Sequence, residues 1–164
     1  MSKKFFKVTM ASIIALSLSM TVVWKNVYGA NTAANALQVV IAALSIAKVS
    51  DLDFGEAPQG SPGKIVTPGT MENVENASFD VNGEPGRSFV IGLPANGSIK
   101  MLINGGGAPE KEIAVSDFQS FPSSSGTLGI DGKKKLFVGA ARGSILGNQT
   151  AGAYSGAFSI TVIY

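Results

Sequence analysis

The sequence predicts an all-β protein, an antiparallel β-sandwich preceded by a cleaved export signal. Three observations lead to this prediction. Short β-rich runs recur after residue 30, turn-forming residues separate them, and no convincing amphipathic helix pattern is found in that region. The length of 164 residues is that of one domain, and a hydrophobic content of 45% excludes a wholly disordered chain.

The first 29 residues have the three parts of a secretory signal peptide. Three lysines give a basic start, residues 8–23 carry no charge, and the small pair Gly29-Ala30 follows. We expect cleavage after Gly29, because cleavage after Ala30 would place the bulky Tyr28 at a recognition position. An uncleaved membrane anchor is the alternative, but the uncharged stretch is shorter than the roughly 20 residues that span a bilayer.

Removal of this signal changes the charge balance. Four of the 13 basic residues lie in it and none of the 11 acidic ones, so the remainder has nine basic residues against 11 acidic, a net charge of −2. The basic surface that nucleic acids or lipid headgroups require is therefore not indicated. No later apolar stretch approaches spanning length, so we expect no nucleic-acid partner and no membrane span after processing.

The chain contains no His and no Cys. Without His it lacks the commonest general base and metal ligand, and without Cys it lacks thiol nucleophiles, thiolate metal sites and disulfides. We therefore expect a non-enzymatic protein with no cofactor and no metal. An exported chain without disulfides must gain its stability from core burial or from pairing with other chains.

The expected strands are short and are separated by turns. Asn-Gly and Asp-Gly pairs between them supply the positive φ angles that tight turns need. The Ala-rich stretch 37–47 also fits a helix, and we interpret it as strand. Residues 122–126 are interpreted as a loop, and the lysines at 133–135 as a solvated turn. The predicted strands are residues 37–41, 44–49, 64–67, 77–81, 88–93, 98–103, 113–118, 135–138 and 153–164.

Both ends of the processed chain have the pattern of strands that pair with another chain. Each alternates apolar residues at a period of two, and the final strand ends on an aromatic residue. Residues 30–43 are an N-terminal extension and a candidate donor strand, which would add to the sheet edge of a neighbour and generate a head-to-tail fibre. The alternative is that both strands pack within their own domain, residues 44–164. The candidate interface residues are Leu37, Val39, Ile41, Phe158, Ile160, Val162 and Tyr164.

Three segments, in this order, resemble a known family. The first is Asp51-Leu52-Asp53-Phe54-Gly55, and the second is the run from Ala77 to Pro85. The third is the C-terminal pattern in which every second residue is specified: Gly152, Tyr154, Gly156, Phe158, Ile160, Val162 and Tyr164. Together they resemble the secreted bacterial proteins catalogued as domain-of-unknown-function family 4402, over about residues 44–164. That family is similar in pattern to pilins of the chaperone–usher pathway, although the present chain lacks the pilin disulfide.

The resemblance implies an incomplete immunoglobulin-like sandwich that a strand from another molecule completes. It implies a non-enzymatic structural subunit of a bacterial surface fibre, or fimbria. Its partners would be other copies of itself or related subunits, with a periplasmic chaperone and an outer-membrane usher. The protein would pass through the periplasm to the cell surface.

A monomeric cell-surface or extracellular binding module, an adhesin or carbohydrate-binding protein, is the alternative function. Such a module would present aromatic side chains in its loops. Phe121, beside Pro122, is the one candidate of this kind that the sequence offers.

Overall fold

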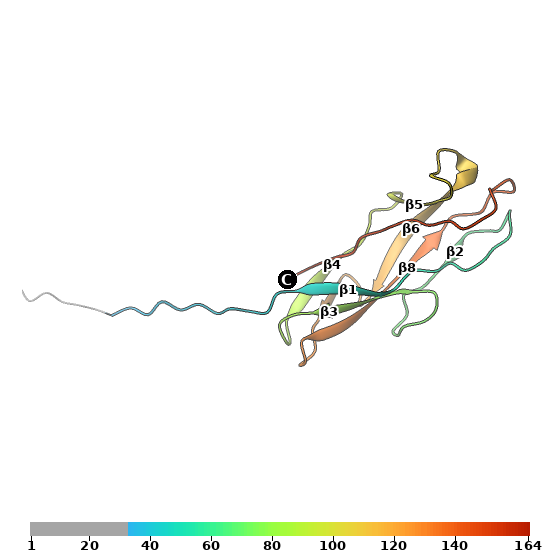
Figure 1. Ribbon diagram of the computed structural model, residues 1–164. Coiled ribbons are helices and arrows are strands. Elements are labelled where there is room, and N and C mark those ends of the chain that lie inside the picture. Colours follow the sequence, from blue (N-terminus) through green and yellow to red (C-terminus); the bar gives the residue numbers. More distant parts are fainter. Residues whose placement is uncertain (1–32) are drawn as a thin grey trace, which may run out of the picture. The chain divides into compact units, whose positions relative to one another are not determined.

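The computed structural model describes residues 33–164, so the expected signal peptide and its cleavage site lie outside the described residues. The chain divides into two units, residues 1–38 and 39–164, and the described part of the first has no secondary structure. Residues 33–164 contain no helix that is long and apolar enough to cross a membrane. The elements are β1 (Ser45–Ser50), β2 (Lys64–Ile65), β3 (Ala77–Asn82), β4 (Ser88–Gly92), β5 (Ile99–Leu102), a 3₁₀ turn (Pro109–Lys111), β6 (Glu112–Phe121), β7 (Ser125–Thr127), β8 (Lys133–Arg142) and β9 (Thr161–Ile163) (Figure 1).

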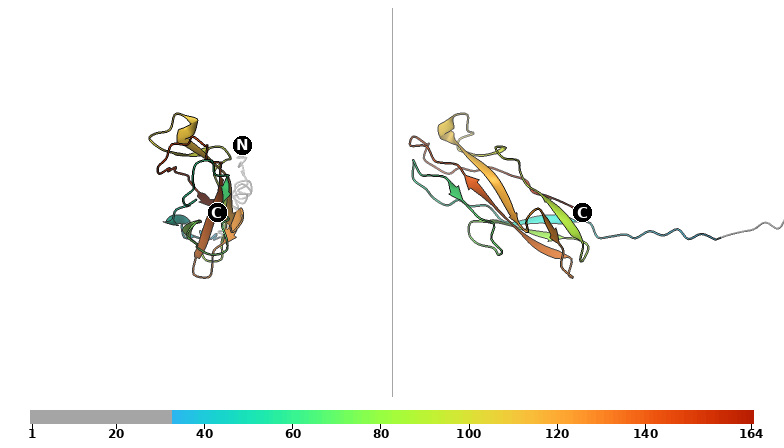
Figure 2. Two further views of the ribbon diagram at one scale, coloured as in Figure 1. Left: turned by 90° about the vertical axis from the view of Figure 1, so that its right-hand side faces the viewer. Right: turned by 180° about the vertical axis from the view of Figure 1, so that it is seen from behind.

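The strands form two antiparallel sheets. In the larger sheet the order is β1-β3-β8-β6-β5, with β2 also paired to β8, and in the smaller sheet it is β7-β4-β9. Figure 2 shows the two layers from the end and from behind. The predicted all-β, antiparallel sandwich is therefore confirmed. β1 and β9 are each the last strand of their sheet.

The main core lies between the two sheets. Phe89 and Ile91 point inward from β4, where they alternate with the exposed Ser88, Val90 and Gly92. This alternation follows from the pleat, which sends successive side chains to opposite faces of a sheet. The fully buried partners from the larger sheet are Val81, Leu136 and Val138.

The strand β8 is longer than the sequence suggested. The lysines at 133–135, which we interpreted as a solvated turn, are its first residues and pair with β3. Their side chains are exposed, but Lys135 lies opposite Asp80, and its Nζ is 3.0 Å from the Asp80 carboxylate. The interpretation as a turn is wrong, because backbone pairing with a neighbouring strand does not require apolar side chains.

A second difference is β7, whose first two residues fall within the predicted loop 122–126. Ser125, Gly126 and Thr127 pair with β4 although none of them is apolar. The reason is Gly126, since a Cβ atom at this position would lie 2.6 Å from the Phe89 ring. The missing side chain lets the backbone lie directly against a core aromatic.

Residues 153–164 do not form one continuous strand. Ser155 makes an isolated bridge with Leu102 at the end of β5, and only Thr161–Ile163 pair with β4. The two partner strands, β4 and β5, are separated by the turn residues 93–98. The C-terminal segment therefore pairs first with β5 and then with β4, and its residues between these two contacts form no β-ladder.

Candidate strand-docking site

The side of the sandwich between β1 and β9 carries unpaired strand edges and incompletely covered apolar side chains. β1 pairs only with β3, and β9 pairs only with β4, among the residues the structure describes. Five apolar side chains, on these two strands or in the residues just before them, pack on the main core and yet are only half-buried. We call this side the docking edge. Its apolar residues are Leu44, Ile46, Phe158, Ile160 and Val162.

Three of the residues predicted for an interface lie together on this edge. Phe158, Ile160 and Val162 alternate with the exposed Ser159 and Thr161, as the sequence predicted. Phe158 also contacts Phe118, with ring centroids 5.1 Å apart in a tilted arrangement. The C-terminal segment thus belongs to the core on one face and leaves its outer backbone edge open.

Tyr164 has a different role from these three residues. Its hydroxyl accepts a hydrogen bond from the backbone N–H of Glu84 (2.6 Å) and donates one to the carbonyl of Ala42 (3.0 Å). The backbone N–H of Ala42 donates to Oε2 of Glu84 (2.8 Å). The Arg87 guanidinium lies 5.3 Å from the centre of the Tyr164 ring, in cation–π range. We call the ring of bonds among Ala42, Glu84 and Tyr164 the clasp.

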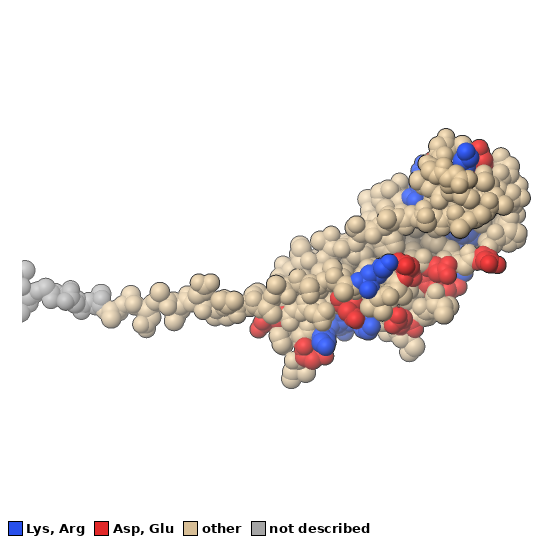
Figure 3. Space-filling view, viewed as in Figure 1, with Lys and Arg blue, Asp and Glu red and all other residues tan. Residues whose placement is uncertain are grey.

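The N-terminal extension is exposed. Leu37 is 91% and Val39 87% exposed, and Ile41, next to the clasp, is 37% exposed. Residues 33–41 form no strand, so the strand predicted at 37–41 is not found in the described chain. Alternation alone does not create a strand, because the backbone needs a partner to pair with. Figure 3 shows that the described part of the extension carries no charged side chain.

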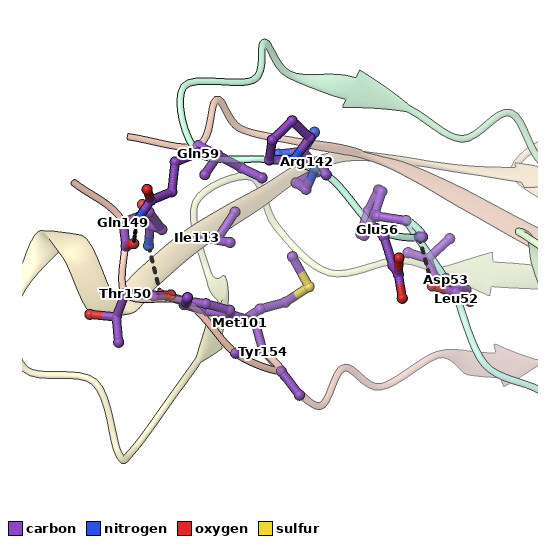
Figure 4. Close-up of a pocket in the computed structure, with 18 residues that line it drawn as sticks. Leu52, Asp53, Glu56, Gln59, Met101, Ile113, Arg142, Gln149, Thr150 and Tyr154 are labelled. Atoms are coloured by element: carbon purple, nitrogen blue, oxygen red, sulfur yellow. Dashed lines mark hydrogen bonds between the residues drawn. The ribbon is translucent and has the colours of Figure 1, made fainter. Parts of the chain in front are cut away.

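A cavity of about 960 Å³ lies at the far end of the docking edge from the clasp. One wall is the segment that follows β1, residues 52–59, and the other is the segment that leads to the C-terminus, residues 149–154. Met101 from β5, Ile113 from β6 and Arg142 from β8 lie between these walls (Figure 4). The cavity therefore extends the docking edge beyond the end of β1.

Hydrogen bonds among buried polar groups hold the C-terminal wall of this cavity. The Gln149 side chain, 2% exposed, donates to the carbonyl of Glu112 (3.2 Å) and to the Tyr154 hydroxyl (3.1 Å). The Tyr154 hydroxyl oxygen lies 2.8 Å from the carbonyl oxygens of Glu110 and of Thr150. The predicted interface residues include neither Gln149 nor Tyr154, although Tyr154 lies between two glycines of the C-terminal pattern.

Arg142 holds two further segments in place beside the cavity. Its guanidinium is almost fully buried and donates to the carbonyls of Pro62 (3.0 Å) and Gly143 (3.1 Å). These bonds fix the loop before β2 and the residue after β8. Arg142 thus has a structural role at the border of the cavity.

An ion pair joins β5 to β6 close to the cavity. Lys100 Nζ lies 2.6 Å from Glu112 Oε2, and the Gly107 backbone N–H donates to the other carboxylate oxygen at 3.1 Å. The hydrogen bond from Lys100, and then that from Gly107, lower the pKa of Glu112 below 4.5. The pair tightens the hairpin that supplies Met101 and Ile113.

Within residues 33–164 no group of three or more acidic, His or Cys side chains is placed to hold a metal ion. No curated protein and no solved structure is significantly similar to the chain. One family profile does match, over residues 44–164, and it is described only as a domain of unknown function, DUF4402. The match starts at Leu44, the first apolar residue of the docking edge, and includes every strand described above. The chain therefore belongs to the DUF4402 family.

Proposed function

We propose that this protein is an exported structural subunit of a bacterial surface fibre, assembled by β-strand complementation. The observation that carries the proposal is the docking edge, where five apolar side chains, on two strands with an unpaired edge or just before them, are only half-buried. A single added strand would pair with β9 and cover these side chains. The N-terminal extension of another copy offers an exposed segment with alternating apolar residues, which pairs with no strand among the described residues of its own chain.

The N-terminal extension is long enough to cover the docking edge. The docking edge with its cavity follows the C-terminal segment from Tyr154 to Tyr164, which has eleven residues. The extension has twelve residues before Ala42, which the clasp holds, namely residues 30–41. At about 3.3 Å per residue in a strand, the C-terminal segment spans about 36 Å and these twelve residues about 40 Å. The extension is therefore long enough to reach from the clasp end to the cavity.

The apolar pattern of the donor also fits a site that buries only one face of the added strand. Leu37, Val39 and Ile41 would face the core, and Gln38 and Val40 would face outward. Full burial of an aliphatic side chain contributes about 1.5–3 kcal/mol, so three such side chains supply several kcal/mol before the cost of ordering the segment.

The position of the extension favours a fibre over a closed dimer. Each extension leaves its own domain at the clasp end, beside Tyr164. If it enters the next copy from the cavity end, every copy has the same orientation and the contact repeats without closing. The donor would then run antiparallel to the C-terminal segment of the acceptor.

Deletion of residues 30–43 tests this proposal. The truncated protein should be exported and remain monomeric at every concentration, whereas the full processed chain should form a concentration-dependent ladder or filaments. Light scattering after size-exclusion chromatography measures the difference. A synthetic peptide of residues 30–43 should bind the truncated protein, and a scrambled peptide of the same composition should not. Fibres that persist after the deletion would refute the donor role.

The cavity supports a second candidate function, that of a monomeric extracellular binding module. Its lining combines apolar side chains with polar ones such as Gln59 and Tyr154. This function predicts that the full processed chain stays monomeric in the same size measurement. It also predicts that a peptide of residues 30–43 does not compete with a ligand in the cavity.

A further inference from the structure

We propose that the clasp prevents the N-terminal extension from completing its own domain and so reserves the docking edge for a second copy of the chain. This inference rests on the proposed function, because it states which molecule supplies the added strand. The extension and the docking edge belong to one polypeptide, so a folded copy could in principle fill its own site. Three features of the described residues oppose this.

The first feature is the bonding of Ala42. Its N–H is held by the Glu84 carboxylate and its carbonyl by the Tyr164 hydroxyl. The Tyr164 hydroxyl is itself fixed by the Glu84 backbone N–H. Both backbone groups of Ala42 are therefore engaged within the domain, the N–H with Glu84 and the carbonyl with Tyr164. A chain reversal at this residue would break both bonds.

The second feature is the direction of the chain. The extension leads into β1 at the end of the domain where the C-terminal segment finishes. To lie on the docking edge of its own domain, it would have to fold back along β1 as a hairpin. The reversal would fall at residues 42 and 43, because Leu44 already packs on the core.

The third feature is the chemistry of that reversal. Two-residue hairpin turns require positive φ angles, which Asn and Gly adopt readily and Ala does not. The sequence at the required place is Ala42-Ala43, whereas Asn-Gly pairs occur at three other turns of this chain. The extension thus lacks the residues that a return to its own domain needs, and a strand from another copy needs no reversal.

The same geometry defines a variant that should complete itself. A two-residue Asn-Gly turn at 42–43 would place Ile41 opposite Leu44 and Val39 opposite Ile46. Residues opposite each other in an antiparallel pair lie on one face of the sheet, and Leu44 and Ile46 face the core. The double substitution Ala42→Asn with Ala43→Gly would therefore direct the apolar side of the extension inward. The hairpin would break both clasp bonds of Ala42, which lie at exposed positions.

The experiment compares three proteins: the full processed chain, the Ala42→Asn/Ala43→Gly variant, and a control with Ala33→Asn and Ala34→Gly. The control introduces the same two residue types where no hairpin with β1 is possible. Amide hydrogen exchange of residues 37–41 is measured at a concentration where each protein is monomeric. The oligomeric state is then measured as the concentration is raised.

We expect residues 37–41 to exchange without protection in the full chain and in the control, and to become protected in the hairpin variant. The hairpin variant should lose the ability to form oligomers, while the control keeps it. Protection of residues 37–41 in the unchanged monomer would overturn the inference, and so would unchanged oligomerisation of the hairpin variant. If the unchanged chain never oligomerises but its residues 37–41 remain unprotected, the proposed function fails, and with it the reservation of the docking edge for a second copy, whereas the block on self-completion stands.

Discussion

Gly156 lets the C-terminal segment lie against β5. A Cβ atom at this position would be 2.4 Å from the carbonyl oxygen of Lys100 and 3.2 Å from Cα of Met101. Both contacts are backbone atoms, which cannot rotate away as the end of a side chain can. The sequence pattern of alternating glycines near the C-terminus thus has a steric cause at this residue.

We predict that Gly156→Ala destabilises the fold by about 1–3 kcal/mol, because the added methyl group forces the two backbones apart. Urea denaturation of the purified protein measures the loss. Gly147→Ala is the matched control, since nothing lies within 4 Å of a Cβ atom there, and it should cost no stability. Equal stability of the Gly156 variant and the unchanged chain would mean that this close approach is not required.

Glu112 makes one contribution to stability depend on pH. Its pKa is lowered below 4.5 in the folded protein by the hydrogen bonds from Lys100 and Gly107. A carboxyl whose folded pKa lies below its unfolded pKa stabilises the fold above the unfolded value, and this stabilisation is lost as the pH falls through the folded value.

Glu112→Gln should therefore be less stable than the unchanged chain at pH 7, and the difference should shrink below pH 4.5. The effect should be small, because Lys100 is about half exposed. Urea midpoints measured between pH 7 and pH 3 report it. Lys100→Gln is a companion variant that should show the same trend, and a difference that stays constant over this range would contradict the assignment.

At the scale of elements, most strands of the domain could be placed from the sequence. The predicted runs at 44–49, 77–81, 88–93 and 98–103 agree with β1, β3, β4 and β5 to within a residue or two. These strands combine β-rich or alternating apolar residues with turn residues on both sides. That combination reflects burial on one face and chain reversal at each end, which are local properties.

The elements that the sequence predicted wrongly depend on partners distant in sequence. β7 forms because Phe89 packs on Gly126, and the first residues of β8 are strand because they pair with β3. Residues 37–41 have a strand pattern but no partner within the described chain. The sequence indicated which C-terminal residues reach the core edge, but the cavity brings together three strands, β5, β6 and β8, and two segments outside the strands, residues 52–59 and 149–154. No local pattern contains that information.

The two faces of the extension should contribute unequally to assembly. Replacing Leu37, Val39 and Ile41 together by Ser should abolish oligomers, because these side chains would fill the docking edge. Replacing Gln38 and Val40 by Ser should leave assembly nearly unchanged, since they would face outward. Sedimentation velocity over a range of concentrations distinguishes the two variants. Equal loss in both would show that the apolar content of the segment matters and its alternation does not.

For the whole molecule, the proposed function predicts that strand binding at the docking edge links folding stability to assembly. A strand that binds only the folded domain stabilises it by mass action. The melting temperature of the full processed chain should therefore rise with protein concentration, and that of the chain without residues 30–43 should not. Differential scanning calorimetry at several concentrations measures both. A melting temperature of the full chain that is independent of concentration would count against strand exchange.

The tyrosines of the clasp and of the cavity wall also determine the intrinsic fluorescence of the molecule. The sequence has one Trp, Trp24, and three Tyr, and Trp24 and Tyr28 belong to the segment that we expect to be cleaved. The fluorophores that remain are Tyr154 and Tyr164, one at each end of the open side. Emission from the processed chain, excited at wavelengths that Phe does not absorb, would then come from these two phenols alone. Arrival of a donor strand should change that emission without any attached dye.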